Sequence, residues 1–446
     1  MTTKGDTERR SPTSLEQALA TALRRRESQS KLRTLKSSSP GSVDFSSNDF
    51  LSLATTKEFR EEYLGELQQQ ILPVGSTGSR LLDGNSQYAE RLEQQIAAFH
   101  GAESGLLIGS GFDANVSIFT CLPQPGDTVL YDELIHASVH DGLRMSRATT
   151  FLSFKHNCLD DFQAKLKLCT SSSQNVFVAV ESVYSMDGDL APLSEMVSIM
   201  KEVYPGNNCH LIVDEAHATG VYGPRGSGRV SDLGLEQDVL VRLHTFGKAL
   251  GSNGAVILCS PTIRSYLINY ARPIIFTTFL SYPNLAAVKV AYDWLAAGKT
   301  ETLSSQLTHL IEYMYARLRS LGPSAQRLEA GSFTLPDACP QSAIFALMMQ
   351  QPRELAAYCQ AAGFVVRAVM HPTVPLGTER VRVCLHAGNT EQEIDALVDR
   401  VRQWLEQKVA CLPTSSSDEP SVQIEGASAP APQAVQTPSA AVLAKL

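Results

Sequence analysis

The sequence predicts an α/β protein built around a large, mostly parallel β-sheet. Apolar runs rich in β-branched residues recur between residues 106 and 260, separated by helical or loop stretches, as in strands joined by crossover connections. From about residue 284 the order changes to long helices with few strands, typical of a smaller α+β domain. The seven strands expected in the large sheet are 106–109, 128–131, 150–154, 176–180, 211–214, 240–246 and 255–260.

Composition excludes several classes of protein. The 446 residues carry a net charge of -8, which offers no general attraction to nucleic acid. No run approaches the roughly 18 apolar residues of a membrane span, and the first residues lack the apolar core of a secretory signal. The nine cysteines include no CxxC pair. We therefore expect reduced thiols, without disulfides or a metal site.

The first 45 residues are expected to form a helical arm. Thr13 and Glu16 have the spacing of a capping box, and the helix that they open should run through Arg26 with its leucines on one face. A Ser/Gly/Pro-rich break ends the arm, and the large domain, 46–283, follows it.

A phosphate could be held where the first long strand of this domain ends. The turn Ser110-Gly111-Phe112 follows that strand and feeds a helix that is expected from Asn115. Backbone N–H groups and the positive end of a helix would point at the sheet edge there. A plain strand-to-helix connection is an equally good interpretation of the same residues.

Polar residues follow other strands at their carboxyl ends. His136 and His140 have helical spacing, but no third ligand is suitably spaced for a metal, so one flat ring over a planar ligand is the better interpretation. The strand 176–180 ends in the polar segment from Glu181 to Asp189, which includes Ser185. Ligands of open α/β sheets bind at this edge.

An acid and an amine reach the same edge in the segment 211–254. Asp214 ends one strand, and Lys248 lies in a turn between the strands 240–246 and 255–260. Walls that exclude water would make the neutral amine of Lys248 accessible for a Schiff base. Alone, a solvated turn lysine and a helix-capping aspartate would be the better interpretations, but together the two residues point to a site.

The smaller domain is expected over 284–410, with helices up to Leu321, strands near 343–349 and 380–385, and a capping box at Thr390 that opens the last helix. The tail, 411–446, is Pro/Ala/Ser-rich and expected to be disordered. It ends in Ala444-Lys445-Leu446, which resembles the Ser-Lys-Leu peroxisomal address. This ending predicts binding to a peroxisomal import receptor and a eukaryotic, fungal-type source; without that receptor the protein would be cytosolic.

Together, the residues at the sheet edge describe one ligand. A lysine for an imine, an acid, a flat imidazole and a phosphate cradle are what pyridoxal 5'-phosphate requires. The acid would keep the pyridine nitrogen protonated, so that the ring can accept electrons from a substrate carbanion.

The motifs resemble those of the α-oxoamine synthases, which are pyridoxal-phosphate enzymes of the aspartate aminotransferase fold. The resemblance covers about residues 14–408. It is carried by 181–189 (ESVYSMDGD), 214–220 (DEAHATG), 244–249 (HTFGKA) and Pro372-Thr373-Val374-Pro375 with Gly377. An ordinary aminotransferase is disfavoured, because that branch usually has tyrosine at the position of His217.

The resemblance implies roles for individual residues. Lys248 would carry the cofactor as a Schiff base and later move the α-proton, with Asp214, His136 and His217 as the other catalytic residues. The cofactor-binding residues would be Lys248, Ser110, Gly111, Phe112, His136, Glu181, Ser185, Asp214, His217, Thr245 and, in a homodimer with shared sites, Thr277 or Thr278 of the partner subunit. Substrate contacts would come from Arg33, Asn48 and Arg382, with Arg380 as an alternative to Arg382.

Within the family, the FSSNDFLSL and GSTGSRL segments are most similar to the biotin-pathway branch, which implies L-alanine and pimeloyl-CoA as substrates. Asp83, Asn85 and Ala218 depart from that branch and leave the acyl chain open. The alternatives are a sister synthase that uses another acyl thioester with alanine, glycine or serine, and a non-catalytic partner subunit. The second is disfavoured, because such subunits lose the lysine that Lys248 supplies here.

Overall fold

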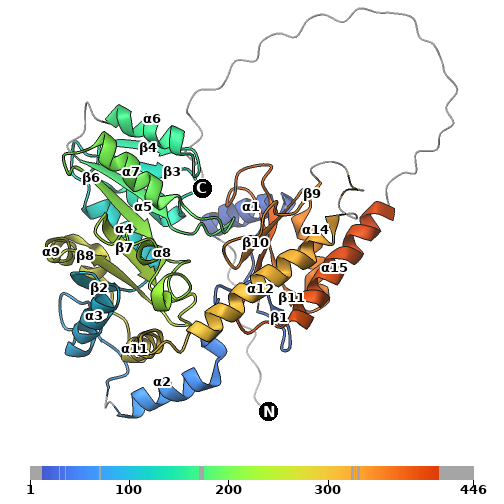
Figure 1. The fold of residues 1–446 in the computed structure, drawn as a ribbon, viewed down its shortest axis with the longest axis horizontal. Helices are drawn as coiled ribbons and strands as arrows, with labels where there is room; N and C mark the ends of the chain where they lie inside the picture. Colours follow the sequence, from blue (N-terminus) through green and yellow to red (C-terminus); the bar gives the residue numbers. More distant parts are fainter. Residues whose placement is uncertain are drawn as a thin grey trace, which may run out of the picture. The chain divides into compact units, whose positions relative to one another are not determined.

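The computed structural model describes residues 13–29, 31–35, 37–69, 72–169, 175–322, 326, 328 and 332–410. The large sheet consists of β2 (Ser104–Ile108), β3 (Thr128–Asp132), β4 (Thr150–Phe154), β5 (Val176–Glu181), β6 (Cys209–Asp214), β7 (Val239–Thr245) and β8 (Ala255–Cys259). These strands are ordered β2-β8-β7-β6-β5-β3-β4; most of them are labelled in Figure 1, in the part of the chain coloured from blue-green to yellow-green. Only β8 is antiparallel to its neighbours, β2 and β7. The predicted fold class and all seven predicted strands are confirmed.

Apolar side chains leave this sheet on both faces, and helices cover both. On β5, Phe177 and Ala179 belong to one core cluster, whereas Val178 and Val180 belong to another. The first cluster includes residues of α4 (Gly111–Cys121), α5 (Ala137–Arg144), α9 (Pro261–Tyr270) and α10 (Arg272–Phe276), and the second includes residues of α6 (Leu159–Cys169), α7 (Leu193–Val203) and α8 (Arg229–Asp232). A strand covered on both faces is apolar throughout, as its sequence requires.

Hydrogen bonds at the first turn determine where the predicted helices begin. The Thr13 hydroxyl accepts from the N–H of Glu16, and the Glu16 carboxylate accepts from the N–H of Thr13, so the capping box of α1 (Ser14–Ser28) is confirmed. The helix α15 (Glu391–Ala410) begins after an equivalent pair at Thr390.

The expected start of α4 at Asn115 was wrong. The Ser110 hydroxyl accepts a hydrogen bond from the N–H of Asp113 at 3.0 Å, so the helix already begins at Gly111. A serine in extended conformation that bonds three residues ahead is an N-cap, and its signal here was masked by the glycine that follows it. Gly111 and Phe112 therefore belong to the first helical turn.

The C-terminal part contains a four-stranded antiparallel sheet ordered β12-β13-β10-β9, where the sequence predicted only β10 (Ile344–Met349) and β13 (Arg380–Cys384). The strands that were missed are β9 (Phe333–Thr334), β11 (Phe364–Val365) and β12 (Arg367–Val369). The expected helical region after residue 284 is two helices, α11 (Tyr282–Ala296) and α12 (Glu301–Arg319), separated near Gly298 with φ +72°. The helix α14 (Pro352–Ala361) packs on β11, β12 and β13.

Strands β1 (Val43–Asp44) and β11 form a separate two-stranded sheet. The two strands pair in parallel, which ties the start of the chain to its C-terminal part. The other elements are α2 (Lys57–Gln69), α3 (Gln87–Phe99) and the short 3-10 helices η1 (Leu53–Thr55) and η2 (Pro224–Gly226). One core cluster contains residues of α2, α3, α11, α12, β10, β13 and α15.

The chain divides into a compact unit up to Val409 and a second unit from Ala410. Except for Ala410, the second unit lies outside the described residues, and so does the predicted targeting tripeptide. The predicted boundaries after residues 45 and 283 stay predictions. No helix in the described part of the chain has the length and apolar character to cross a bilayer.

Candidate active site

Three parallel strands deliver their last residues to one edge of the large sheet. Glu181 ends β5 and pairs with Asp214, which ends β6, and Asp214 in turn pairs with Leu243 on β7. The chain then leaves β7 after Thr245 and places Lys248 in the turn before β8. The structure thus brings the predicted amine and both carboxylates to the same edge.

Burial controls the charge of these groups. Removal from water lowers the pKa of the Lys248 amine to about 8, although the negative charges of Asp214 and Glu181 oppose this shift. Burial, followed by repulsion from Asp214, raises the pKa of the Glu181 carboxyl to about 8. With this pKa about a tenth of the Lys248 amine is neutral near pH 7, far more than for a lysine in water, and a nucleophilic or basic lysine requires this neutral form.

Asp214 is held by a network that the sequence did not reveal. Its Oδ2 accepts a hydrogen bond from Asn115 Nδ2 at 2.7 Å, and its Oδ1 accepts from the N–H of Ala216 at 2.9 Å. Asn115 Nδ2 also donates to Ser138 Oγ at 3.0 Å, and Ser138 Oγ lies 2.7 Å from His136 Nδ1. This series of hydrogen bonds links Asp214 to His136. The sequence feature that could have revealed it was a buried asparagine inside the apolar helix α4.

His217 lies beyond β6 with a buried side chain, and its ring packs at 5.8 Å from Phe50. Burial, together with the positive charges of Lys248 and Arg382, holds the pKa of His217 well below its usual range, so the ring is neutral. Its Nδ1 atom is buried without a hydrogen-bond partner among the described residues. Such an atom carries a desolvation cost unless a ligand pairs with it.

The first turn of α4 and the end of β7 form a cradle for an anion. A side chain at Gly111 would collide with the methyl group of Thr245, so glycine keeps the backbone N–H groups of the helix accessible. The hydroxyl of Thr245 is buried without a partner among the described residues. The Ser110 hydroxyl, in contrast, is used to cap the helix and to bond Asp113.

These observations test whether the residues suit pyridoxal phosphate. The unpaired His217 Nδ1 matches the phenolic oxygen of the cofactor, and the unpaired Thr245 Oγ1 matches its phosphate. The buried acid Asp214 matches the ring nitrogen, and the partly neutral Lys248 amine matches the aldehyde. His136 is exposed at the same edge, where its ring could cover a flat ligand. The set of residues therefore fits the cofactor.

Two arginines on β13 differ in their partners. Arg382 donates from Nη2 to Asn48 Oδ1 at 3.0 Å and from Nε to the carbonyl oxygen of Ser185 at 2.7 Å. Its charge also lowers the pKa of Lys248 and of His217, which places it close to the site. Arg380 is fully buried and paired with Asp187. The geometry therefore favours Arg382 as the partner of a substrate carboxylate.

Other predicted residues are exposed at the surface of the chain. Thr277 and Thr278 are exposed after α10, and Thr278 forms an isolated bridge with Ser79. Arg33 is exposed in the segment that follows α1. Within the described residues, no hydrogen bond or ion pair joins these three side chains to Lys248. Phe112 is 44% exposed and its ring lies edge-on to His136 at 6.5 Å.

His140, the second histidine of the HxxxH pair, packs edge-on against Tyr131, with ring centroids 5.4 Å apart. Over the described ranges, no group of three histidine, cysteine or acidic side chains is arranged to hold a metal ion.

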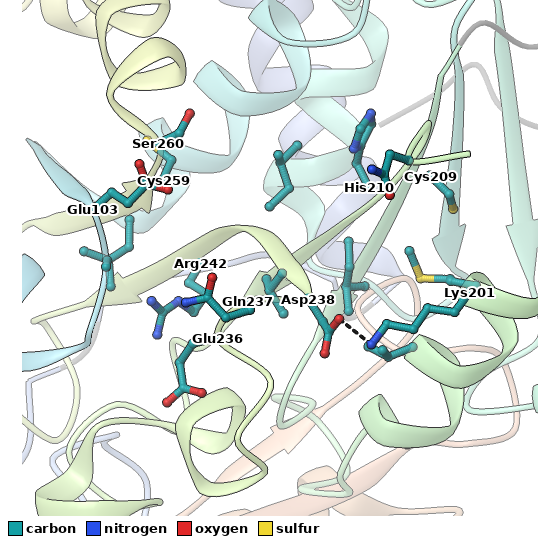
Figure 2. Close-up of a pocket in the computed structure, with 18 of the residues that line it drawn as sticks. Glu103, Lys201, Cys209, His210, Glu236, Gln237, Asp238, Arg242, Cys259 and Ser260 are labelled. Carbon is teal, nitrogen blue, oxygen red and sulfur yellow. Dashed lines mark ion pairs between the residues drawn. The ribbon is translucent and has the colours of Figure 1, made fainter. Parts of the chain in front are cut away.

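A cavity of about 370 Å³ lies at the opposite edge of the large sheet (Figure 2). The amino ends of β6 and β7 line it, and the ion pair of Lys201 with Asp238, 2.6 Å long, lies at its wall. Arg242 lines the cavity and donates to the carbonyl oxygen of His100 at 2.9 Å. Asp214 and Thr245 stand at the other ends of these strands, so this cavity is separate from the candidate active site.

Comparisons with known proteins agree with this geometry. The family model "Aminotransferase class I and II" matches residues 40–401. The 8-amino-7-oxononanoate synthase of Emericella nidulans is 52% identical over 406 residues, covering 89% of this chain and 97% of that protein. The aminoacyl transferase sphA of Aspergillus fumigatus is 42% identical over 372 residues, covering 80% of this chain and 79% of that protein.

Among solved structures, the Sphingomonas wittichii serine palmitoyltransferase matches with a TM-score of 0.77 and 23% identity. The match covers 90% of this chain and all of that chain. At this level of identity the likeness concerns the fold.

Proposed function

Because the chain belongs to the α-oxoamine synthases, pyridoxal-phosphate-dependent acyltransferases of the aminotransferase class I and II family, we propose that it condenses L-alanine with pimeloyl-CoA. The products would be 8-amino-7-oxononanoate, carbon dioxide and free coenzyme A, and the reaction would serve biotin biosynthesis. The name and the 52% identity of the Emericella relative support this choice of substrates.

The observation that carries the proposal is the Lys248 amine, which burial makes partly neutral near pH 7 at the edge where Glu181 and Asp214 end their strands. A neutral amine can bond to an aldehyde carbon and can take a proton from carbon. When bound, pyridoxal phosphate supplies a conjugated ring that accepts the negative charge left at the α-carbon.

The side chains of the site divide the remaining tasks. Arg382 and Asn48 bind the carboxylate of the amino acid, and Asp214, fixed by its own hydrogen bonds, holds a proton on the ring nitrogen. Lys248 then takes the α-proton. The α-carbon bonds to the thioester carbonyl carbon, and the C–S bond breaks to release a thiolate, which takes a proton from water. The bond to the carboxylate breaks last, carbon dioxide leaves, and the electron pair left at the α-carbon takes back the proton held by Lys248.

A second candidate is a sister synthase that uses a different acyl thioester or amino acid. The 42% identity to the aminoacyl transferase sphA of Aspergillus fumigatus favours it. Of the three positions that depart from the biotin branch, Asn85 is used within its own chain: it accepts from Arg80 and donates to Glu90. Ala218 is completely buried, and Asp83 is exposed. Ala218 and Asp83 are therefore the positions to examine for acyl specificity.

A substrate panel tests the proposal. The cofactor-loaded enzyme is mixed with alanine, glycine or serine and with acyl thioesters of different length, and released thiol and carbon dioxide are measured. Alanine with pimeloyl-CoA should give the highest kcat/KM. Lys248→Ala should lower turnover at least about a thousandfold, whereas Lys201→Ala at the opposite edge should not change it. A preference for another thioester would transfer the function to the sister synthase.

We also propose that the enzyme is a homodimer with shared sites. The exposure of Thr277 and Thr278 supports this, because both residues can reach a neighbouring chain, and Phe276 beside them is 68% exposed.

The C-terminal tripeptide supports a peroxisomal location, although it lies outside the described residues. Deletion of Leu446 should move a fluorescent fusion of the full chain from peroxisomes to the cytosol, as seen by co-localisation with a peroxisomal marker. A deletion variant that is still imported would contradict this proposal.

A further inference from the structure

A histidine that the catalytic scheme does not use lies between two carboxylates beside the site. His156 follows β4, and its Nδ1 lies 2.8 Å from Asp132 Oδ1 at the end of β3. Its Nε2 lies 2.7 Å from Asp189 Oδ2, which belongs to the loop after β5. Because both ring nitrogens face carboxylate oxygens, both must carry a proton, and the ring is an imidazolium.

The surroundings stabilise this charge. Burial opposes it, but the hydrogen bonds to Asp132 and Asp189 outweigh burial and raise the pKa of His156 to about 10. Glu133 accepts from the backbone N–H of His156 at 3.1 Å, and the Tyr184 ring lies edge-on to the imidazole at 4.5 Å. The charged groups that face the imidazole from β3 and from the loop are thus acidic.

The loop that His156 holds also carries the partners of the two arginines on β13. In this loop, which we call the 182–190 loop, Val183 and Leu190 form an isolated bridge, and the N–H of Tyr184 donates to the carbonyl oxygen of Asp189 at 2.9 Å. The carbonyl oxygen of Ser185 then accepts from Arg382 Nε at 2.7 Å. Asp189 is therefore connected to Arg382 through the backbone of the 182–190 loop, which the hydrogen bond between Tyr184 and Asp189 closes.

The neighbour of His156 strengthens the same connection. Asn157 Nδ2 donates to Asp189 Oδ2 at 2.6 Å and to the carbonyl oxygen of Leu190 at 3.2 Å, and its backbone N–H donates to Asp132 Oδ2 at 3.0 Å. On the other side, Gly188 has φ +76° and packs against Ser342 and Ile344, so the loop is enclosed between the two sheets.

We propose that His156 is a positioning residue for the amino-acid substrate: through Asp189 it holds the 182–190 loop so that the Ser185 carbonyl orients Arg382 toward the substrate carboxylate. This inference rests on the proposed function, because it assigns Arg382 to that carboxylate. His156 itself touches no reacting atom.

The test compares His156→Asn and Asp189→Asn with the wild-type enzyme, all as full-length, cofactor-loaded protein. Binding of alanine is followed by the change in cofactor absorbance, and turnover is followed with pimeloyl-CoA. Each variant should raise Kd and KM for the amino acid about tenfold, with kcat and the KM for the thioester changed less than about twofold. The double variant should resemble the worse single variant, because both changes break one connection.

The matched control is His210→Asn. His210 is also a partly buried histidine, and its Nε2 lies 3.2 Å from Asn175 Oδ1, but it is in β6 and lines the cavity at the opposite edge of the sheet (Figure 2). This change should leave the affinity for alanine unaltered. If His156→Asn does not fold, Asp189→Asn, which keeps the size of the side chain, serves in its place.

Three outcomes are informative. A fall in bound cofactor or in kcat with an unchanged KM for the amino acid would mean that His156 only stabilises the fold, and would overturn the inference. Unchanged kinetics in both variants would overturn it as well. A wild-type enzyme whose absorbance responds to none of alanine, glycine and serine would overturn the proposed function and, with it, this inference.

Discussion

At the residue scale, the site depends on side chains whose hydrogen-bonding capacity the protein does not use itself. His217 Nδ1 and Thr245 Oγ1 are buried without partners among the described residues, and Lys248 has lost enough water to lower its pKa to about 8. Each of these features costs stability in the absence of a ligand. A protein tolerates such a loss of stability where a bound ligand supplies the missing hydrogen bonds. This is the physical reason to locate the cofactor here.

Gly111 provides a test at this scale. A methyl group at this position collides with the side-chain methyl of Thr245, whose hydroxyl is buried without a partner among the described residues. Gly111→Ala should therefore displace Thr245 and weaken binding of pyridoxal phosphate by roughly tenfold, equivalent to about 1.4 kcal/mol. Dialysis followed by an absorbance titration with the cofactor measures the change in Kd.

The matched control is Gly65→Ala on α2, where an added methyl group meets nothing within 4 Å. It should leave cofactor affinity unchanged and stabilise the helix by about 0.5–1 kcal/mol. Equal cofactor affinity in Gly111→Ala and the wild type would contradict the position of the cradle.

At the scale of elements, the seven strands of the large sheet were predictable because buried parallel strands are continuous apolar runs. The helices that begin at capping boxes were also predictable, since the cap is encoded within four residues, as at Thr13 and Glu16. The strands β9, β11 and β12 were missed, because segments of two or three residues carry no periodic signal and are formed by their pairing partners.

The site shows the same division between local and distant information. Lys248 and Asp214 could be named from the sequence, because a turn after one strand and the last residue of another are local features. Asn115 and His156 could not, because their importance comes from contacts with Asp214 and Asp189, which are far away along the chain. The choice between Arg380 and Arg382 likewise required the positions of Asp187 and Asn48.

At the scale of the whole molecule, the proposed dimer predicts complementation between two damaged subunits. One subunit carries Lys248→Ala and the other carries Thr277→Ala with Thr278→Ala. If each site takes its lysine from one chain and its threonines from the other, half of randomly paired dimers contain one intact site. Mixing and refolding equal amounts should then recover about a quarter of the wild-type activity.

The control replaces the second subunit with one that carries all three changes, so that no pairing restores a complete site. No recovery in the first mixture, although heterodimers are present by mass spectrometry, would mean that the threonines serve their own chain. Each cofactor site would then be formed by the residues of a single subunit.

The order of apolar runs, the caps and the strand-end residues were sufficient to predict the fold class and to name Lys248 and Asp214 as candidate site residues, because apolar runs, caps and strand ends depend on residues close in sequence. The folded chain alone decided which polar atoms remain unpaired, which arginine faces the site and which histidine carries a charge. These properties depend on burial and on distances between residues far apart in the chain. Hydration and electrostatic interactions depend on those distances, and a linear sequence does not contain them.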